Sequence, residues 1–369
     1  MKKLLVVGDF ISGSGLTAVI MNTFGKFNQA EYRISAVGYG RDIAGNVTSE
    51  VGKLGWQLTR SPEVTKHPLQ HWLFWLKFFK ANSFDYVYFN YSSSWNFLPV
   101  LFAKHYSHGK VLVHSHNTYF SHRFSNSLLM KMLTVLNKVG RRAIVRAADV
   151  LIATSEGAAT WMFGQQNLSR VHIVTNGIKL QKYQFSVICR EKIRARYQIS
   201  PTTKVIGFVG VLGERKNPSF AISTFEAFHA EHPDSLLVML GKGPLKSKVT
   251  TYIKNAGLES HFIHFDYVNN VNEWYSAMDA LIFPSQFEGF GLVPLEAQVS
   301  NLKVLCSNVV PKSIFVTSNI TSLPVVNSNA WAKKLAVVLE DTSNRNYFNN
   351  QLAKFSDSRQ IATMEQLLK

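Results

Sequence analysis

The chain has 369 residues and a mass of 41.6 kDa, enough for two domains that each bury a core. Its residues are 46% hydrophobic and 17% charged, which excludes a disordered, fibrous or coiled-coil protein. The net charge of +17 is uneven, because residues 1–183 carry +13 and residues 184–369 carry +4. The first half is therefore expected to meet an anionic partner: phosphate, nucleic acid or a membrane surface.

Short buried strands alternate with helical segments along the chain. The first strand is expected at 2–8, followed by a Gly/Ser-rich turn and a helix near 16–27. Further strands of the first half are expected at 86–90, 111–116, 150–154 and 171–175. Those of the second half are expected at 205–210, 236–241, 262–265, 280–284 and 304–307, with helices such as 218–230 and 271–277 between them. This alternation predicts parallel sheets covered by helices.

The strand–helix pattern restarts near residue 204, after a polar, basic stretch at 179–203. It predicts an α/β fold of two doubly wound, Rossmann-like domains that face a central cleft. The domains are placed at 1–183 and 184–345, and residues 346–369 form a helical tail that is a candidate for crossing back to the first domain. Ligands of such folds bind at the carboxyl ends of the strands, so we expect the substrate in the cleft.

The most specific segment is residues 284–297, PSQFEGFGLVPLEA, which follows a short strand and opens a helix. Its glycines permit close backbone approach, and amides at a helix start favour anions. A carboxylate accepts two hydrogen bonds, so Glu288 and Glu296 can each hold a vicinal diol. One glutamate for the sugar diol, one for the ribose diol and amides for the phosphates between them would together match a nucleotide sugar. The alternative is a pair of solvated glutamates beside a tight turn.

A second segment places two cations where a strand ends. Gly210 ends the strand, and Arg215 and Lys216 follow just before the helix that carries Pro218 in its first turn. An Arg and a Lys there suit a diphosphate, the first by forked contacts and the second as a point charge. The GKGP turn at 241–244 ends the next strand and leaves room for a ligand. An exposed basic loop and an ordinary glycine turn are the alternatives.

In order and spacing these elements resemble the donor-binding domain of glycosyltransferase family four, retaining enzymes of the GT-B fold. Weaker matches extend the resemblance over nearly the whole chain. The stretches Lys216-Asn217-Pro218 and Glu296-Ala297-Gln298 resemble the branch that builds bacterial capsules and exopolysaccharides. The resemblance implies a transferase that moves a hexose or N-acetylhexosamine from a nucleotide sugar, UDP being favoured, to a saccharide acceptor. It implies no metal and no cofactor beyond the nucleotide sugar.

The resemblance also assigns residues. Arg215 and Lys216 would hold the donor diphosphate, Glu288 the hydroxyls of the transferred sugar, and Glu296 the ribose. Backbone amides at 290–292 would contact sugar and phosphate, and residues 267 and 268 would frame the base. Where the family has a Gly-Gly loop, Ser12-Gly13-Ser14-Gly15 has a serine before its last glycine. Besides the four charged residues, the expected donor-binding set is Gly15, Gly210, Gly241, Gly243, Tyr267, Val268, Phe290, Gly291 and Leu292.

Two histidines end a strand of the first half, and alternation puts His114 and His116 on one face. They could bind zinc, but no third ligand lies nearby in the sequence. They could also be structural, hydrogen-bonded histidines. The resemblance favours His116 as a residue close to the reacting sugar and phosphate. The expected catalytic residues are therefore His116, Glu288, Arg215 and Lys216.

The sequence contains no Asp-x-Asp, the usual metal–diphosphate signature of the other major glycosyltransferase fold. Arg215 and Lys216 are therefore expected to replace Mg²⁺ in stabilising the leaving diphosphate. No carboxylate is placed as a covalent nucleophile. The retention that the resemblance implies would then come from front-face attack, with the leaving phosphate helping to deprotonate the acceptor.

Two segments of the basic half combine apolar residues with cations. Residues 127–146 form an amphipathic basic helix, and residues 72–80 are aromatic with flanking lysines. Both could rest on an anionic bilayer, or be core helices with a solvated face. Together with the charge they predict peripheral contact with the inner face of the plasma membrane. A polyprenyl-diphosphate-linked saccharide would be the natural acceptor.

The chain is expected in the cytoplasm. Two cysteines, Cys189 and Cys306, are too few for a disulfide framework and fit a reducing compartment. The apolar run at 4–7 is too short for a signal peptide, and no run reaches the roughly 18 residues of a membrane span. Three other functions remain open: a nucleotide-sugar epimerase of similar fold, a basic nucleic-acid-binding protein without a recognition motif, and a non-catalytic sugar-binding relative.

Overall fold

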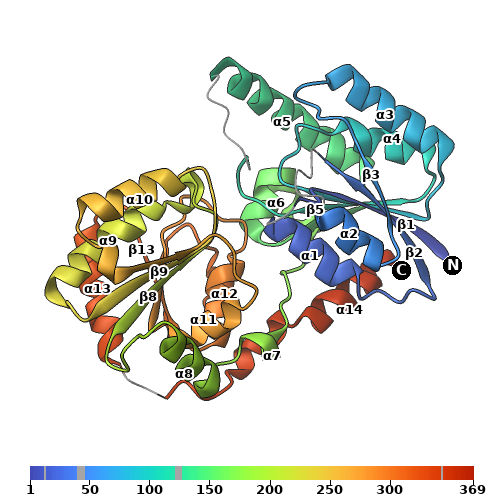
Figure 1. The fold of residues 1–369 in the computed structure, drawn as a ribbon. Helices are drawn as coiled ribbons and strands as arrows, with labels where there is room; N and C mark the ends of the chain where they lie inside the picture. The colour runs from blue at the N-terminus through green and yellow to red at the C-terminus, as the bar shows by residue number, and fades with distance from the viewer. Residues whose placement is uncertain (12–13, 40–45, 121–126, 342–343) are drawn as a thin grey trace. The chain divides into compact units, whose positions relative to one another are not determined.

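A computed structural model describes residues 1–11, 14–39, 46–120, 127–341 and 344–369, which form two compact units (Figure 1). The first unit comprises Met1–Gly177 together with Asp357–Lys369, and the second comprises Ile178–Ser356. The chain thus divides after Gly177 and again after Ser356, whereas the sequence suggested divisions after residues 183 and 345. The last segment of the chain belongs to the first unit.

The first unit is built on a parallel sheet of seven strands in the order β3-β2-β1-β4-β5-β6-β7. Its strands are β1 (Lys2–Gly8), β2 (Tyr32–Gly38), β3 (Gln57–Arg60), β4 (Tyr86–Tyr91), β5 (Lys110–Ser115), β6 (Val150–Ala153) and β7 (Val171–Ile173). Its helices are α1 (Gly15–Phe24), α2 (Asn46–Lys53), α3 (Pro68–Ala81), α4 (Leu98–Tyr106), α5 (Ser127–Ala147), α6 (Glu156–Phe163) and α14 (Asp357–Leu368).

Both faces of this sheet are covered, which explains why β1 is apolar at every central position. Leu5 and Val7 face a core closed by α3, α4, α5 and α6, whereas Leu4 and Val6 face a core closed by α1, α2 and α14. Strands buried on both faces read as continuous hydrophobic runs. Helix α14 is held against α1 by Gln360, whose Oε1 accepts hydrogen bonds from Thr23 and from the Gly177 amide.

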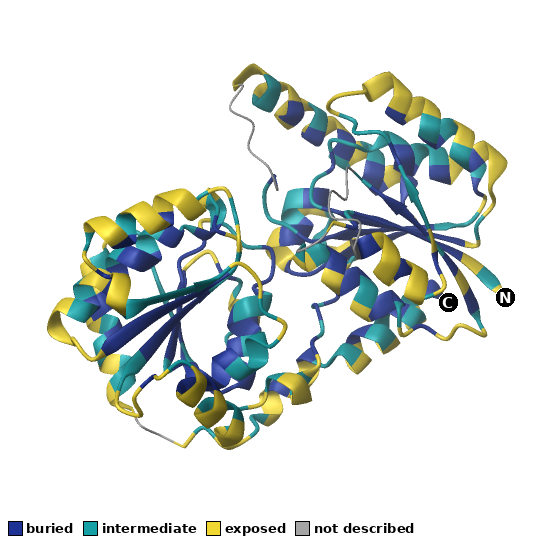
Figure 2. Cartoon of the chain, in the orientation of Figure 1, coloured by how far each residue is buried: buried dark blue, intermediate teal, exposed yellow. Residues whose placement is uncertain are grey.

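The second unit repeats the plan with six parallel strands in the order β10-β9-β8-β11-β12-β13. The strands are β8 (Lys204–Val209), β9 (Ser235–Leu240), β10 (Phe262–Phe265), β11 (Ala280–Phe283), β12 (Lys303–Ser307) and β13 (Ile320–Leu323). The helices are α7 (Leu180–Tyr183), α8 (Val187–Arg196), α9 (Pro218–Glu231), α10 (Lys246–Asn255), α11 (Val271–Ala277), α12 (Leu292–Val299) and α13 (Ser328–Glu340). In each unit the central strands are buried and the outward helix faces are exposed (Figure 2).

The predicted pair of parallel, helix-covered α/β domains is confirmed. Strands β2, β3 and β13 were not among the expected strands, because each is short or carries polar residues. In each unit the chain runs from a central strand to one edge and then crosses back, so β1/β4 and β8/β11 are switch points of the strand order. Ligands of open α/β sheets bind outside the carboxyl ends of the strands at such points. None of the helices in the described ranges is long and apolar enough to cross a membrane.

Candidate functional site

The loops after β8 and β11 meet at the switch point of the second unit. One loop contains a short 3-10 helix over Glu214–Lys216, and the other runs from Pro284 to Gly291. The backbone N–H of Gln286 donates to the carbonyl oxygen of Arg215 at 2.8 Å. The sequence predicted both segments as parts of one site, and this hydrogen bond joins them directly.

Glycines at 241 and 243 let the loop after β9 lie against the loop after β8. A Cβ at Gly241 would collide with the carbonyl oxygen of Gly210, and one at Gly243 with that of Leu212. The N–H of Leu212 donates to the carbonyl oxygen of Lys242 at 3.1 Å, which fixes this approach. The space beside these two glycines is therefore filled by the neighbouring loop, whereas the sequence suggested room for a ligand.

Two features require a glycine at position 210: the backbone conformation there and the side chain of Lys216, which passes close by. Its φ of +148° is one that side-chain-bearing residues rarely adopt. The methylenes of Lys216 pass beside Gly210, and the ammonium lies 4.2 Å from the centre of the Phe283 ring. The lysine therefore reaches from the end of β8 across the end of β11.

Lys216 ends in an ion pair with Glu288. Lys216 Nζ lies 2.6 Å from Glu288 Oε2, and each side chain is only 11% exposed. Burial raises the pKa of Glu288, but the charges of Lys216 and Arg215 outweigh it, so the net pKa lies below the ordinary value. Burial lowers the pKa of Lys216, against the opposing charge of Glu288. The carboxylate is ionised, and the pair presents an ammonium and a carboxylate side by side.

Arg215 supplies a second cation next to this pair. Its side chain is half-buried, and its guanidinium forms no hydrogen bond or ion pair with any residue in the described ranges. A guanidinium presents forked donors that match the oxygens of a phosphate. Arg215 is thus free to bind an anion, whereas Lys216 would have to share an anion with Glu288.

Helix α12 starts at the same place with unused backbone donors. Gly291 adopts a φ of +97° and begins the helix, which has no side-chain cap. In the described part of the chain, the N–H groups of Gly291, Leu292 and Val293 have no acceptor. Phe290 is 3% exposed and packs edge-on against Phe355, which anchors the turn in the core. Free amides at a helix start attract anions.

Glu296, on the second turn of α12, is hydrogen-bonded within the second unit. The hydroxyl of Tyr275 in α11 donates to Glu296 Oε2 at 2.9 Å. Burial raises the pKa of Glu296 to about 7, although hydrogen bonds from Tyr275 and Tyr183 and the charge of Lys182 pull it down. The carboxylate therefore changes its charge near neutral pH, and one of its oxygens already has a partner.

The expected base-framing residues follow β10 at the carboxyl edge of the sheet. Tyr267 is 75% exposed, whereas Val268 is partly buried against the core. Strand β9 separates β10 from β8. Tyr267 is thus an aromatic ring open to solvent on the same edge as the two loops.

In the first unit, His116 is held by Asn90 at the switch point between β1 and β4. Asn90 Nδ2 donates to the carbonyl oxygen of Val7 at 3.1 Å, so its Oδ1 accepts from His116 Nε2 at 3.0 Å. This network assigns His116 Nδ1 as an acceptor. Burial lowers the pKa of His116 to about 3, so the ring is neutral at pH 7 and carries no charge toward a phosphate.

His114 lies beneath His116 on the same face, as alternation predicted. The two ring centres are 4.0 Å apart, and His114 Nδ1 lies 2.9 Å from the hydroxyl of Tyr88. Burial and the neighbouring His116 hold the pKa of His114 well below its ordinary value. Among the described residues, no three His, Cys, Asp or Glu side chains group together as metal ligands would.

Gly15 begins helix α1 in the first unit. The side chain of Ser14 caps this helix by accepting from the Thr17 amide, and no atom lies within 4 Å of where a Gly15 Cβ would be. Ser14, which departs from the family's Gly-Gly loop, therefore has a capping role. Ser12 and Gly13 lie outside the described residues.

Two polar residues of these sites were missed by the sequence analysis. Asn90, which orients His116, is the last residue but one of the otherwise apolar strand β4, and a polar residue so close to the strand end was a usable signal. Tyr275, which binds Glu296, lies in a buried helix and looks like a core aromatic. Its partner is 21 residues away, and nothing in the spacing indicates it.

Two family models match consecutive parts of the chain. Residues 15–182 match "Glycosyltransferase Family 4", and residues 189–355 match "Glycosyl transferases group 1". Among curated proteins, the putative glycosyltransferase EpsF of Bacillus subtilis is 25% identical over 91% of this chain and 87% of its own length. The lipopolysaccharide core biosynthesis mannosyltransferase LpsB of Rhizobium meliloti is 25% identical over 52% of this chain and 56% of its own.

Solved structures share the fold over the whole chain. HepE of Anabaena in complex with UDP superimposes with a TM-score of 0.79 at 14% identity, covering 100% of this chain and 99% of HepE. The sucrose-phosphate synthase of Thermosynechococcus elongatus has a TM-score of 0.76 at 17% identity, covering 100% and 98%. At these identities the likeness concerns the fold.

Proposed function

Since this chain belongs to glycosyltransferase family 4 and is a GT-B glycosyltransferase, we propose that it transfers a hexose or N-acetylhexosamine from a UDP-sugar to a saccharide acceptor. The observation that carries the proposal is the set of groups that lie together at the carboxyl edge of the sheet in the second unit. There the free Arg215, the Lys216–Glu288 pair and the unused amides at the start of α12 lie on loops joined by a hydrogen bond. Family membership argues against the epimerase and nucleic-acid alternatives.

Each part of a nucleotide sugar has a chemically matched group on this edge. Arg215, Lys216 and the amides of Gly291 and Leu292 bind the diphosphate, because cations and free N–H groups favour anions. Glu288 accepts hydrogen bonds from the hydroxyls of the sugar, and Glu296 accepts them from the ribose. UDP is the proposed nucleotide because HepE, which shares the fold, is known with UDP.

The chemical step releases UDP, so charge develops on the diphosphate. Arg215 and Lys216 stabilise this charge as fixed cations in the role that a metal ion has elsewhere. When the diphosphate engages Lys216, Glu288 is released from its partner and can turn to the sugar hydroxyls. His116 contributes a neutral acceptor, Nδ1, and binds a hydroxyl rather than a phosphate.

We expect the transfer to retain the anomeric configuration. Glu288 is the carboxylate of this loop, and it is proposed to hold the hydroxyls of the transferred sugar, so no carboxylate is assigned as a covalent nucleophile. The proposed route is therefore front-face attack by the acceptor, with the leaving phosphate taking the proton. NMR of the first-formed product reads the outcome: an α-linked sugar is expected from an α-linked donor, and a β-linked product would refute the route.

Donor binding is expected to strengthen as pH rises from 6 to 8. A carboxylate accepts both ribose hydroxyls only when it is ionised, and the pKa of Glu296 lies at about 7. Because the pKa of Glu296 is higher in the folded protein than in the unfolded chain, its contribution to the free energy of unfolding is largest at a pH below its ordinary pKa. That contribution is lost as pH rises through about 7.

Calorimetric titration with UDP-glucose tests this, because its diesterified diphosphate does not titrate in that range. The tightest binding is expected for UDP compounds over those of GDP and ADP. Glu296→Gln should bind more weakly and lose the pH dependence. Binding that is unchanged between pH 6 and pH 8 in the wild type would contradict the ribose role of Glu296. No binding of any nucleoside diphosphate would remove the proposed function.

The acceptor is proposed to be a lipid-linked saccharide of exopolysaccharide synthesis, met at the inner face of the plasma membrane. The exopolysaccharide context is proposed from the stretches Lys216-Asn217-Pro218 and Glu296-Ala297-Gln298, which resemble that branch of the family. Residues 64–148 contain eleven Lys and Arg but a single acidic residue, Asp85. Helix α5 carries an exposed apolar stripe, which comprises Leu128, Met132, Val135 and Val139. Exposed lysines, Lys131 and Lys138, flank this stripe, a combination suited to an anionic bilayer.

Sedimentation with vesicles tests the membrane contact. The protein is expected to bind vesicles containing anionic lipid at low salt and to be released at high salt. Lys131→Glu/Lys138→Glu should reduce binding strongly. The matched control is Lys333→Glu/Lys334→Glu on α13 of the second unit, which changes the net charge equally and should bind as the wild type does. Equal losses in the two variants would show a net-charge effect and contradict a docking role of α5.

A further inference from the structure

Helices α11 and α12 of the second unit are joined at two levels. Near the switch point, the hydroxyl of Tyr275 donates to Glu296. At their C-terminal ends, Arg345 bridges the two helices, since its Nη2 donates to the carbonyl oxygens of both Tyr275 and Ser300 at 2.8 Å. Ser300 is the C-terminal cap of α12, and its amide bonds to the carbonyl oxygen of Glu296. Arg345 therefore joins the backbones of α11 and α12, the same two helices whose side chains Tyr275 and Glu296 are hydrogen-bonded.

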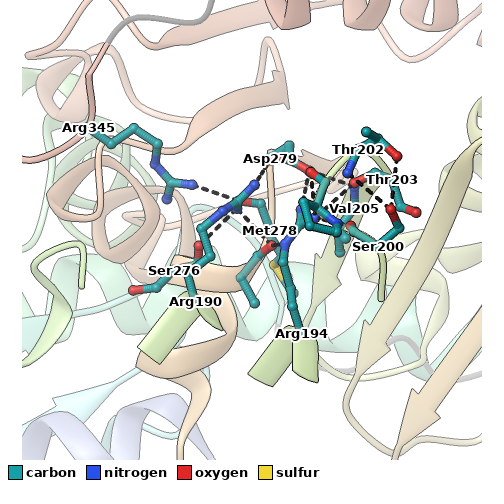
Figure 3. A network of polar contacts seen from close by, with 12 residues as sticks. Arg190, Arg194, Ser200, Thr202, Thr203, Val205, Ser276, Met278, Asp279 and Arg345 are labelled. Carbon is teal, nitrogen blue, oxygen red and sulfur yellow. Dashed lines mark hydrogen bonds and ion pairs between the residues drawn. The ribbon is translucent and has the colours of Figure 1, made fainter. Parts of the chain in front are cut away.

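Arg345 belongs to a larger set of arginines around the end of α11 (Figure 3). The last carbonyls of a helix lack partners within the helix, and here arginines satisfy them. Arg190 donates to the carbonyl oxygens of Ser276, Ala277 and Met278, and Arg194 donates to that of Ala277. The axial position and rotation of α11 are thus set by several directed hydrogen bonds.

Arg345 itself is held firmly. Its guanidinium lies 4.5 Å from the centre of the Phe185 ring, and its Nη1 donates to the carbonyl oxygen of Met278 at 2.7 Å. A carbonyl-bound, ring-stacked guanidinium has a fixed orientation, which a lysine could not reproduce. Arg345 is therefore suited to position α11 relative to α12.

Tyr275 has the geometry of a group that orients a carboxylate. Its ring is fully buried in the core, so the hydroxyl has little freedom. It occupies one lone pair of Glu296 Oε2, and Tyr183 donates to the same carboxylate, which leaves two of its roughly four acceptor positions available. A ribose diol needs two of them in a defined direction. An unanchored glutamate would have to give up the freedom of three side-chain torsions on binding.

We propose that Tyr275 and Arg345 are positioning residues for nucleotide binding: Tyr275 orients the Glu296 carboxylate toward the ribose hydroxyls, and Arg345 holds the two helices that bring them together. This inference rests on the proposed role of Glu296 toward the ribose. Neither residue touches the nucleotide. Their effect is confined to the part of the binding energy that comes from the ribose.

The groups that face Glu296 are Tyr275 from α11 and Tyr183 with Lys182 from α7. All three favour the ionised carboxylate, because two donate hydrogen bonds and one is a cation. Removing the hydroxyl of Tyr275 therefore weakens the ribose contact in two ways. It frees the side chain, and it moves ionisation of Glu296 to higher pH.

Calorimetry with UDP and 2′-deoxy-UDP on the full chain tests the inference. Tyr275→Phe is expected to weaken UDP binding about tenfold and 2′-deoxy-UDP binding much less. With UDP-glucose, the midpoint of the pH dependence should move upward in the variant. The matched control is Tyr252→Phe, which removes a tyrosine–glutamate hydrogen bond to Glu226 elsewhere in the same unit and should change neither ligand.

The inference is wrong if Tyr275→Phe binds UDP as tightly as the wild type does. It is also wrong if the variant loses the same affinity for UDP and for 2′-deoxy-UDP while the midpoint of its pH dependence with UDP-glucose is unchanged. Arg345→Lys is also expected to weaken the binding of UDP more than that of 2′-deoxy-UDP. Equal losses of affinity for the two nucleotides would contradict the positioning role of Arg345. Thermal unfolding of each variant identifies general misfolding. A wild type that binds no nucleoside diphosphate refutes the proposed function. A wild type that discriminates the ribose, with Tyr275→Phe unchanged, refutes only this inference.

Discussion

Replacing Lys216 with Met is expected to lower kcat about 100- to 1000-fold. Met keeps the apolar stem that passes beside Gly210 and lies over the Phe283 ring, but it removes the ammonium. The site is largely buried, so water cannot supply the lost charge as UDP leaves. Arg215 remains and preserves part of donor binding. The loss should therefore be larger in kcat than in the affinity for UDP.

The same variant also changes Glu288, which loses the ion pair that keeps its pKa low. Thermal unfolding of Lys216→Met/Glu288→Gln measures the effect of the stranded carboxylate, because the double variant removes that carboxylate. Its thermal stability should recover relative to the single variant, while its kcat stays low because both site residues are lost. Lys254→Met, an exposed lysine on α10, is the control and should be fully active. Activity within a few fold of the wild type in Lys216→Met would show that this lysine has only a structural role.

Replacing Asp279 with Asn is expected to lower the free energy of unfolding by about 3–5 kcal/mol. Asp279 binds Arg190 and Arg194 at 2.7 Å each and also accepts from the Val205 amide, as Figure 3 shows. The side chains of Arg194 and Asp279 are 7% and 16% exposed. Without the carboxylate, two guanidinium charges are left close together with little access to water.

Urea unfolding followed by circular dichroism measures this loss. The control is Asp341→Asn, because Asp341 pairs with Lys303 at a site where its side chain is 55% exposed. Exposed ion pairs contribute little, so this variant should unfold close to the wild type. Equal midpoints for Asp279→Asn and the wild type would contradict the view that this carboxylate neutralises the arginine cluster.

Much of the fold could be predicted because its signals are local. Apolar runs such as Leu4–Val7 and Leu281–Phe283 mark strands buried on both faces, and Gly210 and Gly291 mark turns with unusual φ. Strand β3 was missed because it has only four residues, QLTR, without an apolar run. Edge strands bury less, so their sequences are less constrained.

The candidate site could be predicted as a set of residues but not as a set of contacts. Lys216 and Glu288 each belong to a short motif, so both were identified. Their ion pair spans 72 residues and depends on β8 lying beside β11. The order of strands in a sheet is decided by how whole helices and strands pack, and no local spacing encodes it. Tyr275 was missed for the same reason, whereas Asn90 was missed although its polar side chain near the end of an apolar strand was a local signal.

The sequence by itself determined the class of this protein: two helix-covered parallel sheets, a glycosyltransferase family, and the charged residues of the candidate site. Short segments decide these features, since a strand, a helix start or a basic loop depends on neighbouring residues. The tertiary structure alone decided which groups meet. It placed α14 in the first unit through Gln360, turned Gly241 into a packing contact, and gave Glu296 a tyrosine partner and a pKa near 7. Burial and pairing between distant residues set these properties, because desolvation and hydrogen bonding depend on what surrounds a side chain in space.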